Sequence, residues 1–288
     1  MREIRTDLAI ERQAKIPGPV PGIETGERRY ENCTVTRIRV TAPEGAKALG
    51  KPMGTYFTVR TDRFPDARVL CDDRLTAVKD ALRSLLPKSG GVLVTGLGNP
   101  AITPDALGPK CAAMIFATRH IDEKMRRQLQ MPALREVTAV APGVTGQTGL
   151  EAQELIESVC RRVKPAAVVA VDALAAGSVT RLANTVQLSD AGIEPGAGVG
   201  NARRALNRET LGVPVIAVGV PTVVDALSVA ADVTGTAAGA DPGSEYAGMM
   251  VTPRDIDTLI DNASRLLALA VNCALQDRLS PDELLGLM

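Results

Sequence analysis

Two aspartates, Asp105 and Asp172, stand where the sequence best suits acid–base chemistry. Asp172 directly follows the apolar run Ala-Val-Val-Ala-Val, and Asp105 lies beyond the run Val-Leu-Val and the loop Gly-Leu-Gly-Asn-Pro. A charged group next to a buried strand needs a partner or a task. Two carboxyl groups that meet in one crevice, roughly 3 to 5 Å apart, can share a proton and activate water, one as base and the other as acid.

Asp105 also has a purely structural interpretation. The tripeptide Thr103-Pro104-Asp105 fits the N-cap and first two positions of a helix, where a carboxylate complements the helix dipole. Local sequence alone favours this role for Asp105. Asp172 is harder to explain structurally, because it would end a strand that is buried on both faces.

Histidine and cysteine offer little to metal or nucleophilic chemistry. His120 is the single histidine, and the five cysteines lie far apart with no Cys-x-x-Cys pair, so we expect buried free thiols. Residues 196–201 lack the third glycine of a dinucleotide loop, and Ser178 lacks the Gly-x-Ser-x-Gly context of a nucleophile. We therefore expect no metal site and no cofactor.

The composition indicates an ordinary globular protein. The chain has 288 residues, of which 45% are hydrophobic and 23% charged, and 33 basic side chains balance 33 acidic ones. A neutral chain with three Phe, three Tyr and no Trp suits neither a phosphate-binding face nor base stacking. No apolar run is long enough to cross a membrane. We expect a cytoplasmic protein that binds neither nucleic acid nor membrane.

Four short Val-rich runs predict the strands that would position the two aspartates. Such unbroken runs are typical of parallel strands covered on both faces, and helical segments lie between them. We therefore predict one α/β domain with a mostly parallel central sheet flanked by helices. In such a sheet ligands bind beyond the carboxyl ends of the strands, where both aspartates lie. The runs are residues 92–94, 137–141, 166–171 and 215–218.

The remaining segments complete the prediction. Residues 1–31, rich in Pro and Gly, suggest an extended N-terminal arm, and the alternating segments 34–41 and 55–60 suggest a hairpin. Thr148 and Glu151 have the spacing of a capping box at a helix start. Amphipathic helices are predicted from residue 73 to before Pro87, from 148 to 163 and over 253–276.

Taken together, these segments resemble the germination protease family, atypical aspartic endopeptidases of spore-forming bacteria. The resemblance covers nearly the whole chain. Its segments, in order, are Arg5-Thr6-Asp7-Leu8-Ala9, Gly50-Lys51-Pro52 with Gly54, residues 103–109, Thr118-Arg119-His120, Ala141-Pro142-Gly143-Val144, Asp172-Ala173-Leu174-Ala175-Ala176, Gly198-Val199-Gly200-Asn201 and residues 219–226.

The resemblance implies a function and a set of residues. It places the two essential aspartates on Asp105 and Asp172, which reverses the local interpretation of Asp105. It implies a zymogen that removes its own N-terminal segment, with the cut between Asp7 and Leu8 in Thr-Asp-Leu-Ala-Ile-Glu. The chain would then divide into a propeptide, residues 1–7, and a peptidase domain, residues 8–288. The resemblance further implies a homotetramer in the spore core that begins to degrade small acid-soluble spore proteins during germination.

The chain departs from the family pattern in two places. A seven-residue propeptide is short, and Gly177 stands where a basic residue is expected. Two other functions stay open. One is a metal-dependent maturation endopeptidase of the hydrogenase-maturation type, for which His120 would have to join the carboxylates. The other is an inactive binding or scaffold protein on the same fold.

Overall fold

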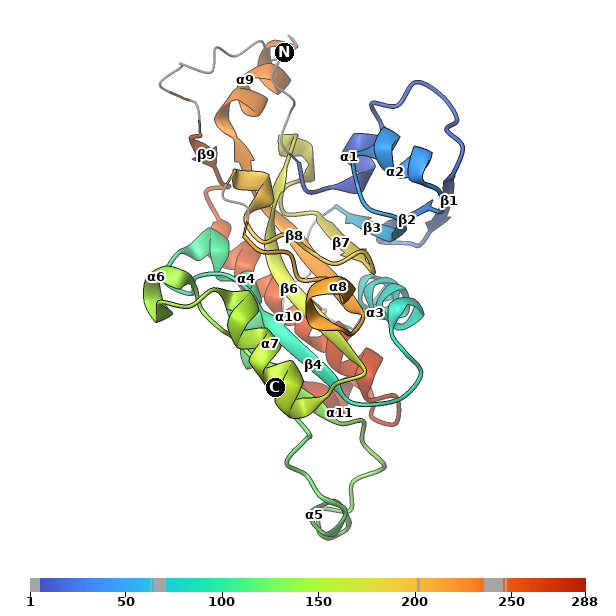
Figure 1. The fold of residues 1–288 in the computed structure, drawn as a ribbon, viewed down its shortest axis with the longest axis vertical. Coiled ribbons are helices and arrows are strands. Elements are labelled where there is room, and N and C mark those ends of the chain that lie inside the picture. The colour runs from blue at the N-terminus through green and yellow to red at the C-terminus, as the bar shows by residue number, and fades with distance from the viewer. Residues whose placement is uncertain (1–5, 63, 65–70, 201–202, 236–245, 247) are drawn as a thin grey trace.

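The structure is a computed structural model that describes residues 6–62, 64, 71–200, 203–235, 246 and 248–288. Within these residues one nine-stranded sheet runs through the molecule in the order β1-β2-β3-β7-β8-β6-β4-β5, with β9 paired to β8 (Figure 1). The strands are β1 (Ile23–Arg29), β2 (Cys33–Val40), β3 (Gly54–Thr61), β4 (Val92–Gly96), β5 (Val137–Val140), β6 (Ala167–Ala176), β7 (Thr185–Ser189), β8 (Val215–Asp225) and β9 (Met250–Val251).

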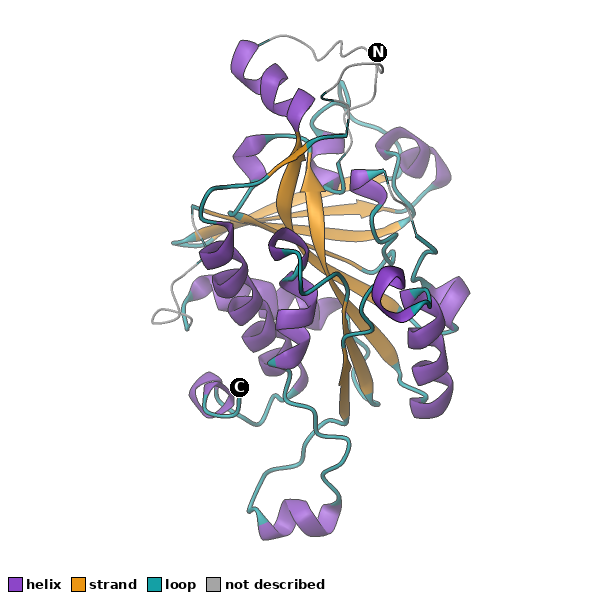
Figure 2. Ribbon diagram, turned by 90° about the vertical axis from the view of Figure 1, so that its left-hand side faces the viewer, coloured by secondary structure: helices purple, strands orange, loops and turns teal. Residues whose placement is uncertain are grey.

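Helices cover both faces of this sheet (Figure 2). They are α1 (Ala9–Gln13), α2 (Pro43–Leu49), α3 (Asp73–Leu85), α4 (Leu107–Ala113), α5 (Glu123–Gln128), α6 (Thr145–Thr148), α7 (Ala152–Val163), α8 (Arg208–Leu211), α9 (Ala226–Thr234), α10 (Ile256–Leu275) and α11 (Pro281–Leu285). Short 3₁₀ turns η2 (Thr103–Asp105), η3 (Val179–Arg181) and η4 (Ala197–Val199) lie in the connections.

The predicted α/β fold is confirmed, and the sheet is mixed. In one half β4 pairs in parallel with β5 and β6, and β6 pairs in parallel with β8. In the other half β1, β2, β3 and β7 pair antiparallel, and β7 joins β8 antiparallel. The expectation of a mostly parallel sheet therefore holds for the Val-rich strands alone. The short turn between β1 and β2 can join only antiparallel strands, whereas parallel strands need a crossover.

The strands of the parallel half contribute to two separate hydrophobic cores, because their side chains alternate between the two faces of the sheet. Val92 and Val94 pack with α3, α4 and α10 in the larger core, whereas Leu93 packs with Ile156 and Cys160 of α7 on the other face. Figure 1 shows α7 in front of β4 and β6 and α10 behind them. Burial on both faces accounts for the unbroken apolar runs of the sequence.

The N-terminal segment is more ordered than predicted. In place of an extended arm to residue 31, residues 9–13 form α1 and β1 adds an edge strand to β2. The seven residues of β1 are mostly exposed and lack alternating apolar positions, so their sequence gave no strand signal. The predicted hairpin of β2 and β3 is confirmed, with Val40 opposite Gly54 and α2 in the connection.

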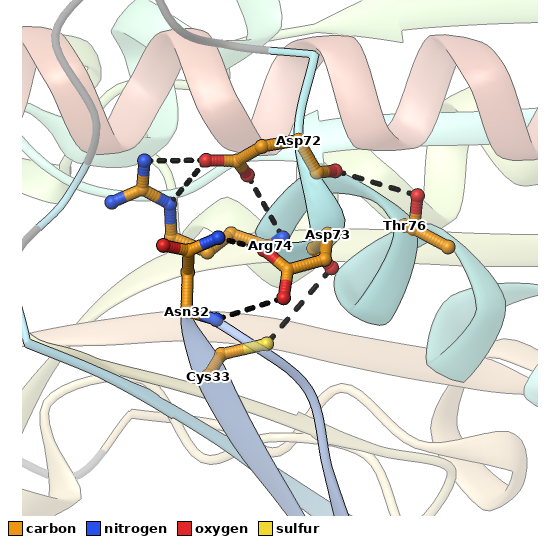
Figure 3. A network of polar contacts seen from close by, with 6 residues as sticks. All are labelled: Asn32, Cys33, Asp72, Asp73, Arg74 and Thr76. Carbon is orange, nitrogen blue, oxygen red and sulfur yellow. Dashed lines mark hydrogen bonds and ion pairs between the residues drawn. The ribbon is translucent and has the colours of Figure 1, made fainter.

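A polar network fastens the turn between β1 and β2 to α3 (Figure 3). Asp72 caps α3 by accepting the N–H of Arg74 at 2.9 Å, and it also forms an ion pair with the Arg74 guanidinium. Asp73 accepts the backbone and side-chain N–H groups of Asn32 at 2.8 and 2.7 Å. The turn between β1 and β2 is thereby held against the start of α3.

The helix predictions are confirmed in outline and corrected in detail. The helix predicted from residue 73 is α3, and the one predicted over 253–276 is α10. The capping box belongs to Glu151 and Glu154 instead of Thr148 and Glu151. Thr148 ends the separate turn α6, because Gly149 adopts a left-handed conformation at φ 74° and stops it.

Cysteines and membrane spans were also predicted from the sequence. The five cysteines are free, and four are buried as expected, but Cys71 is exposed. Among the described helices none combines the length and the apolar character that a membrane span requires.

Candidate active site

A cavity of about 640 Å³ opens at the carboxyl ends of the parallel strands, where the topology predicts a ligand site. Its wall includes Asp105 beyond β4, Gly143 beyond β5, Asp172 in β6 and Gly219 in β8. Gln187 of the antiparallel strand β7 closes another side. The structure thus brings both predicted aspartates into one cavity.

Asp172 lies inside β6, not at its end. The strand continues to Ala176, but its neighbour β4 stops at Gly96, which pairs with Val171. Asp172 is therefore the first residue of β6 beyond the edge of β4, and it is only 5% exposed. Its Oδ1 accepts the N–H of Ala173 at 2.9 Å. Burial, and next the charge of Asp105, raise the pKa of Asp172 well above its usual value.

Asp105 ends the turn η2 and faces the same cavity. Its Oδ2 accepts the N–H of Asn99 at 2.7 Å, and no side-chain cap bond forms at the start of α4. The predicted helix start is present as η2, with Ile102 instead of Thr103 at the N-cap position and Asp105 in the first turn. Gly98 makes the tight approach possible, because at φ +115° a Cβ there would collide with the carbonyl oxygen of Asp105. Burial raises the pKa of Asp105, and the Asn99 N–H partly opposes the rise.

The dipeptide Asp7-Leu8 lies in this cavity region as well. The N–H of Asp7 donates to the Ala175 carbonyl at 3.0 Å, and the N–H of Ala175 donates to Asp7 Oδ2 at 2.9 Å. Leu8 is fully buried against Leu174 and Ala176. The sequence predicted an extended arm here, and instead residues 6–8 are packed against β6. Residues 1–5 of the predicted propeptide lie outside the described residues.

Opposing influences act on the Asp7 carboxyl group. Burial, and to a smaller degree the charge of Glu194, raise the pKa of Asp7 above its usual value, whereas the Ala175 N–H, Lys51 and Arg12 oppose the rise. Burial lowers the pKa of Lys51, and the Asp7 carboxylate opposes that shift. A Cβ at Gly198 would collide with Asp7 Oδ2, so this glycine leaves the room that the carboxylate occupies. Lys51 and Gly198 both lay in segments of the family resemblance, but nothing in their local sequence assigned them to this pocket.

Two further contacts fix the segment that follows. Gln187 donates from Nε2 to the Asp7 carbonyl at 2.8 Å and accepts the Ala9 N–H at Oε1 at 2.6 Å. Glu11 Oε2 accepts the N–H of Gly177 at 2.8 Å, so the backbone of Gly177 holds the arm where a basic side chain was expected. Gln187 was not predicted from the sequence, since a lone glutamine in a strand belongs to no motif.

His120 is not brought to the aspartates. The backbone N–H groups of Thr118 and Arg119 donate to the Val137 carbonyl at the start of β5, whereas Gly143, beyond the end of β5, lines the cavity. His120 is exposed at that opposite edge. Among the described residues no cluster of three or more His, Cys, Asp or Glu has the geometry of a metal site.

Comparison with known proteins identifies the family. The family model described as germination protease matches residues 3–236. The chain belongs to the germination protease family. Germination proteases from Clostridium perfringens and Clostridium tetani are 38% and 37% identical to it over 96% and 98% of each chain. One from Priestia megaterium is 39% identical over 80% of this chain and 65% of its own.

Membership of the germination protease family supports a peptidase activity in spore germination and confirms the family that the sequence segments predicted. A solved structure, a NiFe hydrogenase maturation protease from Thermococcus kodakarensis, matches with a TM-score of 0.37 at 18% identity, covering 68% of this chain and 98% of that one.

Proposed function

We propose that this germination protease is an aspartic endopeptidase that starts the degradation of small acid-soluble spore proteins, and that it is made as a zymogen that cuts its own Asp7–Leu8 bond. The observation that carries the proposal is the cavity that Asp105, Asp172 and Asp7 line together, with Leu8 buried next to Asp7 against Leu174 and Ala176. The division into a propeptide, residues 1–7, and a peptidase domain, residues 8–288, follows from this cut.

The two aspartates would take different roles in proton transfer. Asp172 is the more deeply buried, and the charge of Asp105 further favours its protonated form, so Asp172 holds the shared proton. Asp105 accepts the Asn99 N–H, which favours its ionised form, so it takes the proton of the attacking water. The water oxygen bonds to the peptide carbon, the C–N bond then breaks, and the leaving nitrogen receives a proton from the dyad.

The position of Asp7-Leu8 supports the zymogen. Asp7 lines the cavity, and its carboxylate is close enough to Asp172 to raise the pKa of that residue. While the segment occupies the cavity, a substrate chain is excluded from the same contacts. Mild acid would promote the cut, because the dyad needs one proton and because lower pH neutralises acidic groups that repel Asp7 from the site.

The substrate and the assembly are proposed from the family. An acidic residue before the cut and an aliphatic one after it, as in Asp7-Leu8, would be the pattern read in the spore proteins. We further propose a homotetramer in the spore core, which analytical ultracentrifugation of the purified chain tests.

Self-processing and peptide cleavage together test the proposed function. The purified chain is held at mildly acidic pH and its N-terminus is sequenced, with Asp172→Asn as the control. A new terminus at Leu8 in the parent alone is expected. The processed protein should also cut a peptide containing Thr-Glu-Ile-Ala-Ser-Glu-Phe after the first Glu, as read by mass spectrometry. Cleavage by both chains would reveal a contaminating protease, and an unchanged Met1 would contradict self-processing at this site.

A further inference from the structure

Gln187 forms hydrogen bonds with the main chain on both sides of the Asp7–Leu8 bond. Its Nε2 donates to the Asp7 carbonyl at 2.8 Å, and its Oε1 accepts the Ala9 N–H at 2.6 Å. The orientation of the amide is fixed, because a carbonyl can only accept and a backbone N–H can only donate. The side-chain amide therefore pairs with residues 7–9 as the backbone of a neighbouring strand would, and fixes their position along the sheet.

The sheet register places Gln187 and Asp172 on one face at the same level. Gln187 pairs with Gly219 of β8, and Gly219 pairs with Asp172 of β6. Residues paired across neighbouring strands point to the same face, and two strand spacings separate the backbones of Gln187 and Asp172 by about 10 Å. Gly219, between them, has no side chain, and the Leu174 side chain of β6 occupies the space where a Cβ at Gly219 would stand. Gln187 and Asp172 line the same cavity on either side of it.

The carbonyl that Gln187 binds belongs to the bond that the proposed function cuts. We propose that Gln187 is a catalytic residue of this reaction, whose Nε2–H binds the carbonyl oxygen and stabilises the negative charge that develops on it. This inference rests on the proposed function.

When the water oxygen bonds to the Asp7 carbonyl carbon, the π electron pair of the carbonyl moves to its oxygen. The Gln187 N–H donates a hydrogen bond to this negatively charged oxygen. When the C–N bond breaks, the pair returns, and the Leu8 nitrogen takes up the proton. The distance of 2.8 Å from Gln187 Nε2 to the Asp7 carbonyl oxygen is that of a formed hydrogen bond in the uncut chain, so the donor is in place before the charge develops.

Two features make Gln187 more than a structural support. Gln187 is 9% exposed, and the two contacts given above account for both polar atoms of its amide. Neither contact links it to its own sheet. Both go to the segment around the scissile bond, so the loss of the amide affects that bond first.

The test uses the full-length chain and follows the first-order appearance of the chain that begins at Leu8, by intact mass, across a range of acidic pH. Because the substrate segment is part of the chain, its rate reports the chemical step without a separate binding term. Gln187→Ala should slow self-cleavage by roughly 10²–10³-fold at every pH, the usual effect of removing one such donor.

Gln187→Glu separates the catalytic role from a structural one. Its shape is preserved and it can still accept the Ala9 N–H, but an ionised carboxylate has no hydrogen to give to the Asp7 carbonyl. The rate of Gln187→Glu relative to the parent should therefore be low when the new carboxyl is ionised and recover as falling pH protonates it. Gln13→Glu adds the same charge to α1, where Gln13 contacts Thr25, and should keep the parent rate.

Each outcome decides the inference. Gln187 variants that fold normally and process at the parent rate would overturn it. An equal loss in Gln187→Glu at every pH would assign Gln187 a structural role and would overturn it too. A parent chain that never forms the Leu8 terminus would instead refute self-processing at this site, and the role of Gln187 would fall with it. Thermal unfolding of each variant shows that the fold is retained.

Discussion

The two halves of the sheet supply the cavity with different kinds of group. The parallel half, β4, β5, β6 and β8, brings Asp105 and Asp172, whose pKa values burial raises. The antiparallel half, β1–β3 and β7, brings Gln187 and the connection that carries Lys51, both of which act on the Asp7 segment. The proposed acid–base groups and the groups that contact Asp7 thus come from different elements, so that one set can be perturbed without the other.

The halves meet along a short seam. β7 pairs with β8 at three positions, one of which is Gln187 opposite Gly219. Gly219 is in turn paired with Asp172, so the register brings the two sets of groups to one level of the sheet. Substitutions made in one half at a time therefore separate the contributions of the two halves.

The largest effect is expected in the parallel half. Asp105→Asn and Asp172→Asn should each lower peptide cleavage by roughly 10²–10⁴-fold, because a neutral amide keeps the packing but cannot exchange the proton. Because the variants should not process themselves, parent and variants are each produced without residues 1–7, and their cleavage of the peptide, with circular dichroism to show an intact fold, measures this. His120→Ala, at the opposite edge of the sheet, is the control and should keep full activity. Full activity in either aspartate variant would remove that residue from the mechanism.

A smaller effect is expected in the antiparallel half. Lys51→Met removes a positive charge that favours the Asp7 carboxylate, and self-cleavage should slow by about tenfold, equivalent to about 1.4 kcal/mol. Asp7→Asn should slow it similarly. The double variant should lose little more than either single one, since both changes remove the same interaction.

Lys47→Met provides the matched control for Lys51, because Lys47 is exposed on α2 and should tolerate the change. Additive losses in the double variant would show that Lys51 does not act through Asp7.

The smallest effect is expected in the pH dependence of stability. Burial raises the pKa values of Asp172, Asp105 and Asp7 above the ordinary 3.8, so above that value the folded chain binds more protons than the unfolded chain. The free energy of unfolding should therefore fall as pH rises through the folded pKa values. Urea denaturation between about pH 4 and pH 7 measures this fall. Asp172→Asn should flatten it, and a parallel curve for parent and variant would contradict a strongly raised pKa at Asp172.

Much of the parallel half could be predicted from sequence. The Val-rich runs and the amphipathic stripes of α3 and α10 report burial directly, because each residue's environment follows from the period of its element. The rule that ligands bind beyond the carboxyl ends of parallel strands then joined Asp105 and Asp172 in one crevice, although they lie far apart in the chain. Even here the full length of β6 was not predicted, since the apolar run ends just before Asp172 while the strand continues to Ala176.

The antiparallel half was less predictable. β1 has mostly exposed side chains, and its pairing with β2 depends on backbone hydrogen bonds that leave no apolar period. Gln187 and Lys51 are single polar residues without a motif, and their role depends on where Asp7 lies.

The sequence by itself determined the family and the α/β class and singled out the two candidate aspartates and the proposed Asp7-Leu8 site, because apolar periods and ordered segments are local properties of the chain. Only the tertiary structure decided that Asp105 accepts the Asn99 N–H, that residues 6–8 pack against β6, and that Gln187 reaches the Asp7 carbonyl. The physical reason is that these contacts join residues up to 180 positions apart, and their geometry depends on strand order and register, which no local pattern encodes.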